Sequence, residues 1–404
     1  MTSPESAEQL RTSRRHWVLA TGILAVVGLV AGVVVTTTVS QASSSQQVIS
    51  VTNRQCGDDW QVGQPGHQTF SVVNQGTEAA EVLLENGSGG VVAEIAVIGP
   101  GTTVEMPADL GNGTYTFTCY LPHGWVLTSP AVRVTGATTR SSSSGLKMIT
   151  PDMLDYPNDA YEGYAAQQLS ALAAAVATIQ QDLVANNLTA ARSDWLTAMT
   201  DWERVGASYD SFGKLGEAVD GLPDGLLGGV GDPHFTGLHR LEYGLWHGQS
   251  ASALLPVAQT LSADVATVQQ HLDSADLAGD PSNLPTRAHE ILEDALRDHL
   301  SGIDDLGAGA EYPETAADLE ATRAVLGDLA PLINPRAPHL LATADDQMNT
   351  LQAALTATQD NGQWQTPQQV PQAGREQVDA ALGALLGTLS TVPDLLQAAG
   401  SGGS

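Results

Sequence analysis

The pattern of apolar residues changes once along this chain, and this change constrains the fold more than any other feature. Over residues 46–135, β-branched runs such as HQTFSVVN and GTYTFTCYL are separated by Gly, Asn or Pro. Such runs are typical of a small antiparallel β sandwich. Over residues 159–398, Ala, Leu and Gln dominate and the apolar positions follow a helical period. The sequence therefore predicts a multidomain protein, in which a small all-β sandwich is followed by an all-α helical bundle.

Prolines at or near the starts of the expected helices support the helical prediction, because a helix tolerates proline in its first turn. Eight helices are expected, which is enough for two four-helix halves. A linker is expected over residues 136–158, beginning with GATTRSSSSG, and a disordered tail over residues 399–404. The expected helices lie near residues 159–186, 189–209, 235–248, 251–273, 284–304, 313–331, 334–359 and 370–398.

The first 42 residues have the pattern of an export signal or a membrane anchor. Three arginines precede an uncharged run from Trp17 to Val35. A run of this length can span a bilayer or form the apolar part of a signal peptide. Cleavage after Ala42 and retention as a single N-terminal anchor both remain open. In either case, residues 43–404 are expected outside the cytoplasm, in the periplasm or cell envelope.

The chain is strongly acidic, with 45 Asp and Glu residues against 16 Lys and Arg and a net charge of −29. A protein that binds DNA or RNA needs a basic face to displace counterions from the phosphates, and this sequence offers none. An acidic surface instead favours solubility and attracts cations. The charge therefore argues against a nucleic-acid partner and is compatible with cation binding.

The only two cysteines, Cys56 and Cys119, both lie in the expected β region. Outside the cytoplasm, such a pair usually forms a disulfide. Closing a loop of this length is worth about 4 kcal/mol in the chain-entropy estimate. The alternative is that both remain thiolates and bind a metal. The two alternatives exclude each other, because a disulfide sulfur coordinates metals poorly.

The segment FTGLHRLEYGLWHG, residues 235–248, places a base and an acid in an apolar setting. His239 and Glu242 stand three apart among leucines and a tryptophan. Helical positions three apart share a face, so both side chains are expected to be buried. Buried His and Glu must be paired or metal-bound, and helical bundles build metal sites from such pairs. Gly237 and Gly244 are expected to let neighbouring elements approach closely. From the spacing alone, a purely structural His–Glu hydrogen bond remains an alternative.

These residues carry a resemblance to a known family. FTGLHRLEYGLW resembles the Gly-x-His-x-x-Glu motif of the imelysin-like domain, an all-helical extracytoplasmic module of bacterial iron uptake. ISVTNRQCGDD, FSVVNQGTEAAEVLLEN and GTYTFTCYL resemble the cupredoxin-like domain at the front of the EfeO family. The order of signal, cupredoxin-like domain and imelysin-like domain is also similar. The resemblance covers about residues 46–398, and the order of two unlike domains is more specific than either motif.

The resemblance implies a set of metal ligands in the helical domain. His239 and Glu242 match the motif itself. DWERVGASYDSFGKLGEAVDG is similar to the family's Tyr-Glu segment and its downstream Ile-Asp, which nominates Glu203 and Asp220. VGA, residues 205–207, stands where the family usually has Ile-Glu-Pro. One expected carboxylate is therefore missing, and the coordination number stays open.

Other polar residues near these positions are weaker candidates. Arg240 matches an arginine of the family and is expected to support the ligands rather than to bind metal. His289 and Glu293 stand four apart on one helical face, and His234 and His247 flank the main motif, where they could line its mouth. For each histidine, a surface or structural role is favoured.

The β domain offers a second metal hypothesis. A blue-copper site uses two His, one Cys and a weak axial Met. Cys119 is followed by His123 but by no Met close downstream, and Glu81 lies near the upstream position that would carry His. A blue-copper site is therefore not expected. The resemblance implies instead a metal site around Glu81, Cys56 and Cys119, which stands against the disulfide.

The resemblance implies a protein that captures ferrous or ferric iron, with copper or zinc as alternative metals. The implied partners are an iron permease and a haem-peroxidase-like protein of the same uptake system. A metallopeptidase is the second hypothesis, but a zinc site needs about three protein ligands. Tyr243 stands where the inverted His-x-x-Glu-His motif needs its last histidine, so no peptidase activity is expected. The third hypothesis is a non-catalytic cell-surface scaffold.

Overall fold

The computed structural model describes residues 47–136, 145–206, 212–272 and 281–398. The expected signal or anchor over residues 1–42, most of the Ser- and Thr-rich part of the expected linker and the expected tail lie outside these ranges. Across the described residues, every helix is too short or too polar to cross a lipid bilayer.

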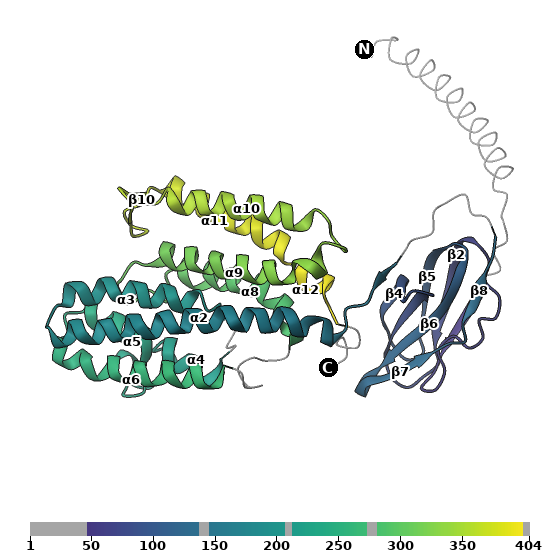
Figure 1. The fold of residues 1–404 in the computed structure, drawn as a ribbon, viewed down its shortest axis with the longest axis horizontal. Helices are drawn as coiled ribbons and strands as arrows, with labels where there is room; N and C mark the ends of the chain where they lie inside the picture. The colour runs from purple at the N-terminus through teal and green to yellow at the C-terminus, as the bar shows by residue number, and fades with distance from the viewer. Residues whose placement is uncertain (1–46, 137–144, 207–211, 273–280, 399–404) are drawn as a thin grey trace, which may run out of the picture. The chain divides into compact units, whose positions relative to one another are not determined.

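The β region is a sandwich of two sheets (Figure 1). One sheet has the strand order β1-β2-β5, and the other has the order β7-β6-β3-β4-β9, with β8 paired to β6. The β1–β2 pair is parallel, so the prediction of a wholly antiparallel sandwich is wrong for that pair. The strands are β1 (Gln47–Val51), β2 (Gly66–Asn74), β3 (Ala80–Asn86), β4 (Gly90–Ile98), β5 (Thr103–Leu110), β6 (Gly113–Leu121), β7 (Trp125–Thr128), β8 (Val132–Val134) and β9 (Leu146–Lys147).

The core of the sandwich contains three aromatic rings in edge-to-face contact. The ring centroids of Trp60, Phe70 and Phe117 lie 5.3–5.4 Å apart, and all three side chains are buried. Edge-to-face contacts of this kind add to the stabilisation from apolar burial. Cys56 and Cys119 are also fully buried, and they form a disulfide with their Cα atoms 5.8 Å apart. The disulfide prediction is therefore confirmed.

The helical region follows the β region, as predicted, and its helices match most of the expected spans. The helices are α2 (Pro151–Val184), α3 (Leu188–Glu203), α4 (Gly213–Asp220), α5 (Gly237–Trp246), α6 (Ala251–His271), α8 (Leu284–Asp294), α9 (Glu311–Ile333), α10 (Leu340–Thr356), α11 (Gln372–Leu389) and α12 (Val392–Leu395). Shorter elements are a π-helical turn (Ala295–His299), 3₁₀ turns (Pro122–Gly124, Gly229–Gly231, Pro281–Asn283) and a small hairpin of β10 (Gln359–Asp360) and β11 (Gln363–Trp364).

Three differences from the predicted helices have local causes. Helix α2 begins at Pro151, inside the expected linker, and continues through Pro157, which is buried with the apolar face of the helix. Helix α4 was not predicted, because its sequence GKLGEAVD contains two glycines that lower helix propensity. The last expected helix is divided into α11 and α12, and α12 has a proline in its first turn, where proline is tolerated.

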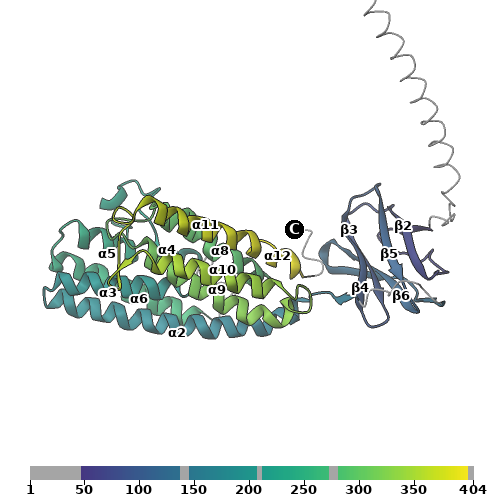
Figure 2. The ribbon, with the colours of Figure 1, turned by 90° about the horizontal axis from the view of Figure 1, so that it is seen from above.

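The helical region contains two apolar cores. One core joins α3, α4, α5 and α6 to the later turns of α2, and the other joins α8, α9, α10, α11 and α12 to the first turns of α2. This packing follows the two-half arrangement, with α2 contributing to both halves. Figures 1 and 2 show α2 running along the length of the helical region.

Candidate metal site

Two glycines allow α5, which carries the Gly-x-His-x-x-Glu motif, to lie close to its neighbours. Gly237 has a φ of +89°, and a Cβ atom there would lie 2.4 Å from the carbonyl oxygen of Val219. A Cβ atom on Gly244 would lie 2.2 Å from a methyl group of Leu254. Both distances are shorter than van der Waals contact. A larger residue at Gly237 would meet backbone and push α5 away from α4, whereas one at Gly244 would force the packed side chain of Leu254 on α6 to shift. The predicted need for glycine at both positions agrees with these distances.

His239 and Glu242 point into the protein and contact each other. The two residues are 4% and 1% exposed, and Nδ1 of His239 lies 2.9 Å from Oε2 of Glu242. The second carboxylate oxygen of Glu242 accepts hydrogen bonds from the backbone N–H groups of Leu306 and Ala308, at 2.8 and 3.0 Å. Both oxygens of Glu242 are thus engaged. A carboxylate in this position fixes the orientation of a metal-binding imidazole.

The other ring nitrogen of His239 faces Asp220 at the end of α4. The distance from Nε2 to Oδ1 of Asp220 is 3.3 Å. Burial disfavours protonation of His239, but the charges of Asp220 and Glu242 outweigh it and raise the pKa of His239 to about 10. Burial raises the pKa of Asp220 to about 7, although His239 opposes this shift. Three of the four predicted helical-domain ligands are thereby brought together.

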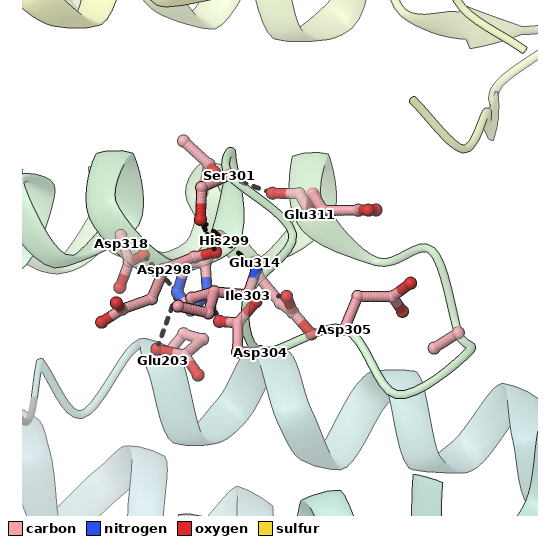
Figure 3. A network of polar contacts seen from close by, with 12 residues as sticks. Glu203, Asp298, His299, Ser301, Ile303, Asp304, Asp305, Glu311, Glu314 and Asp318 are labelled. Atoms are coloured by element: carbon pink, nitrogen blue, oxygen red, sulfur yellow. Dashed lines mark hydrogen bonds and ion pairs between the residues drawn. The ribbon is translucent and has the colours of Figure 1, made fainter. Parts of the chain in front are cut away.

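The fourth predicted residue, Glu203, contacts a histidine that the sequence analysis missed. Oε2 of Glu203 lies 3.5 Å from Nε2 of His299, and Oδ2 of Asp318 lies 3.1 Å from the same nitrogen. Nδ1 of His299 is in short hydrogen-bond contact with the carboxylate of Asp304, and Oε2 of Glu314 lies 3.7 Å away. Figure 3 shows these carboxylates converging on the His299 ring. His299 is therefore a second centre of the site.

Two features place these side chains around His299. The π-helical turn after α8 ends at His299, and such turns occur often at functional sites. Helix α9 carries Glu311, Glu314 and Asp318 at positions i, i+3 and i+7, and all three are buried. This acidic stripe is visible in the sequence and could have nominated α9. The π-helical turn has no comparable sequence signal.

The carboxylates around His299 are held at an electrostatic cost. Burial and the nearby charge of Asp318 raise the pKa of Glu203 to about 7, and burial raises the pKa of Asp318 to about 6. Oε1 of Glu203 and Oδ1 of Asp304 are buried without a hydrogen-bond partner. Buried oxygens of this kind are costly unless a donor or a cation satisfies them. The arrangement is therefore suited to a bound cation.

One cavity of about 630 Å³ is lined by residues of both histidine centres. His299 belongs to two buried groups, one with Glu203 and Asp318 and one with Asp304 and Glu314, whose potential ligand atoms lie within 4.8 Å of one another. Carboxylate oxygens with imidazole nitrogens suit iron, manganese or zinc. The lining residues are Glu203, Glu217, Asp220, Gly221, Leu222, Asp224, Gly225, Leu226, His234, Phe235, Thr236, His239, Ile291, Asp294, Asp298, His299, Asp304 and Asp318.

The departure from the family pattern after Glu203 has a structural reason. Gly206 has a φ of +67°, and a Cβ atom there would lie 3.0 Å from a methyl group of Ile291. The hydroxyl group of Tyr161 donates to the carbonyl oxygens of Val205 and Gly206. A larger side chain at residue 206 would disturb this turn, so the turn is built for glycine and not for a carboxylate.

The weaker candidates lie in different places. His234 lines the cavity, whereas His247 does not, and Nδ1 of His247 lies 2.9 Å from the carbonyl oxygen of Tyr243. His289 and Glu293 contact each other at 3.2 Å, also outside the cavity lining. For His247 and His289, these contacts agree with a structural role.

Arg240 does not line the cavity. Its guanidinium group donates to the side-chain oxygen of Gln249 at 3.0 Å, near the end of α5. The expectation that Arg240 supports the ligands is therefore wrong in this structure. Arg240 shares a helix with the motif, but its side chain points to another neighbour.

The disulfide contradicts the second metal hypothesis. That hypothesis named Glu81, Cys56 and Cys119 as ligands in the β domain. Each sulfur is bonded to the other, so neither is a thiolate, and disulfide sulfurs coordinate metals poorly. Glu81 lies half-buried on β3. The buried groups suited to a metal, among the residues described, lie in the helical region.

Comparison with known proteins gives the family. A family model described as imelysin, and designated peptidase M75, matches residues 158–392. The iron uptake system component EfeO of Escherichia coli strain K12 is 24% identical over 357 residues, which cover 88% of this chain and 92% of the relative. The EfeO of Shigella boydii serotype 4 is 24% identical over 336 residues, which cover 83% of this chain and 87% of the relative. The resemblance stated from the sequence is confirmed, and the chain belongs to the imelysin family.

Proposed function

We propose that this chain is the metal-binding component of an iron-uptake system, with iron as its cargo. It would capture iron outside the cytoplasm and deliver it to a membrane permease. Two relatives that align with most of the chain carry the name iron uptake system component. A haem-peroxidase-like protein would be the second partner, and export would depend on the N-terminal segment.

The observation that carries this proposal is the excess of buried carboxylates at the cavity. Oε1 of Glu203 and Oδ1 of Asp304 are buried without a hydrogen-bond partner. A protein seldom retains such groups unless they have a ligand, because their desolvation is not compensated. Carboxylate oxygens are natural ligands for a hard cation. An imidazole nitrogen alongside them favours iron over magnesium or calcium.

In this proposal, His239 binds iron through Nε2, and Asp220 and Glu203 supply oxygen ligands. Glu242, which the sequence named as a ligand, instead acts on Nδ1 of His239 in this proposal and holds the ring in place, because both of its oxygens are already engaged. A metal-binding imidazole is neutral, so iron must displace a proton from His239. Iron affinity is then expected to rise with pH.

A binding role is proposed in preference to peptidase activity. The imelysin family model carries a peptidase designation, which keeps the enzyme hypothesis in view. A catalytic zinc site generally has three protein ligands and a water-activating base. Tyr243, at the position of the missing third histidine, stacks on His247 with ring centroids 4.1 Å apart, and neither residue lines the cavity. This arrangement argues against a third zinc ligand and fits the proposed capture and delivery of the metal.

The proposal is tested by iron titration of the purified protein. His239→Ala should weaken iron binding by at least about tenfold, the lower end of the losses that supporting residues alone produce. His289→Ala is the matched control, because His289 also lies on a helix beside a glutamate but outside the cavity lining. Helicity should be unchanged in both variants. Equal iron affinity of the wild type and His239→Ala would refute the proposal.

A further inference from the structure

We propose that the cavity holds two cations at once, and that the second is bound by Nε2 of His299 with Asp318 and Glu203. This inference rests on the proposed function, because it assumes that the cavity binds the metal cargo. It goes beyond that function by giving the site two separate positions.

The two histidines are held by the same device. Nδ1 of His239 contacts Glu242, and Nδ1 of His299 contacts Asp304. In metal sites, a carboxylate on one ring nitrogen commonly fixes the tautomer and leaves the other nitrogen for the metal. Both imidazoles line the same cavity. Each is therefore arranged to offer Nε2 to its own cation.

Each Nε2 atom has its own carboxylate neighbours. Nε2 of His239 faces Asp220 at 3.3 Å, and Nε2 of His299 faces Asp318 at 3.1 Å and Glu203 at 3.5 Å. Potential ligand atoms of Glu203, His299 and Asp318 lie within 4.8 Å of one another, and all three residues are buried. A cation at His299 would thus have three protein ligands, and neither Asp220 nor His239 would need to bind it.

Glu203 connects the two positions. Oε2 of Glu203 approaches His299, whereas Oε1 is buried without a hydrogen-bond partner. Glu203, Asp220 and His239 line the same cavity. A carboxylate that offers one oxygen to each position can bind both cations, as carboxylates do in two-metal helical bundles.

Carboxylates outnumber histidines in the cavity, and most of them surround His299. Two carboxylates lie within ion-pair distance of His239, and four lie within that distance of His299, which gives six in total. One divalent cation at His239 is balanced by the two carboxylates beside that histidine. The four carboxylates at His299 then face only one imidazole. A second divalent cation bound at His299 reduces this excess of negative charge.

A different placement, on Nδ1 of His299 with Asp304 and Glu314, is less well supported. The short contact with Asp304 already occupies Nδ1, and Glu314 lies 3.7 Å away and does not line the cavity. The two placements predict different effects of mutation. Asp318→Asn removes a carboxylate ligand from the proposed position, whereas Glu314→Gln leaves its three proposed ligands in place.

The test uses Mn²⁺ as the probe, with the full chain titrated at neutral pH. Wild-type protein should bind one more Mn²⁺ than His299→Gln or Asp318→Asn. Its electron paramagnetic resonance spectrum should show two spin-coupled ions, whereas both variants should show isolated ions. His239→Gln should also lose one ion and the coupling. Glu293→Gln, at a carboxylate that pairs with His289 outside the cavity lining, should keep both ions. Circular dichroism identifies any variant that has lost its helices, and the conservative Asp318→Asn exchange keeps the test available if His299→Gln does not fold.

The outcomes separate this inference from the proposed function. If only His239→Gln loses Mn²⁺, the second position is refuted while the first stands. A single ion in the wild type that every histidine variant loses would also refute the second position. Loss of one ion in Glu314→Gln but not in Asp318→Asn would overturn the assignment to Nε2. Absence of Mn²⁺ binding by the wild type would refute the second position, whereas the iron titration alone decides the proposed function.

Discussion

Removing the carboxylate of Glu242 should destabilise the metal-free helical region, and the size of the loss depends on which atoms replace it. Glu242→Ala removes both the contact with His239 and the acceptor of two backbone N–H groups in the loop at Leu306 and Ala308. Glu242→Gln keeps one oxygen, which can still accept from that loop. It cannot keep the charge that His239 faces.

The expected loss follows from these contacts. Breaking a buried ion pair by removing one partner costs about 3–5 kcal/mol. Glu242→Ala leaves His239 and two loop amides without their acceptor, so its loss should reach the upper part of that range. In Glu242→Gln the amides keep an acceptor, and the loss should be smaller by about 1–3 kcal/mol, the cost of leaving a buried donor unsatisfied.

The free energy of unfolding is measured by urea denaturation of metal-free protein, followed by far-ultraviolet circular dichroism, which reports mainly the helices. Glu293→Gln is the control, because Glu293 also pairs with a histidine but is more exposed. The control should change stability by less than about 1 kcal/mol. Equal losses for Glu242→Ala and Glu242→Gln would refute the role assigned to the loop amides. If Glu242→Ala loses no more unfolding free energy than Glu293→Gln, the stabilising role of the buried His239–Glu242 pair is refuted.

Three further predictions concern pH, packing and catalysis. Because the pKa values of Glu203 and Asp220 are raised to about 7, the folded metal-free protein binds more protons than the unfolded chain, and its stability should fall as pH rises from about 4 to 7. Urea denaturation across this range checks the slope, which should flatten in Glu203→Gln. Gly244→Ala should lower the free energy of unfolding by about 1–3 kcal/mol, whereas Gly383→Ala, a helical site with open space around it, should be neutral or stabilising. Zinc-loaded protein should not cleave casein above background, and metal-dependent cleavage would overturn the binding role.

The sequence could predict the fold class because each half of the chain has one clear periodicity. Alternation and turn residues mark the strands, and the helical period marks most helices. It could not place α4, whose glycines weaken its helical signal, nor the start of α2, where Pro157 imitates a helix boundary. These boundaries are decided by tertiary packing and not by local propensity.

The candidate site was only half predictable for a similar reason. His239 and Glu242 are recognisable because both members of the pair lie on one helix at a fixed spacing. His299 depends on a π-helical turn and on carboxylates from α3, α9 and a loop, which meet only in the folded chain. Arg240 shows the opposite error: its place in the motif suggested a supporting role, but the folded chain turns its side chain toward Gln249.

The most direct test of the central claim is a crystal structure of the iron-loaded protein with anomalous scattering measured at the iron edge. The proposed function predicts an iron peak in the cavity, bonded to Nε2 of His239 and to oxygens of Asp220 or Glu203. An iron peak located only outside the cavity, or no peak at all in protein shown to contain iron, would contradict the claim that this cavity carries the cargo.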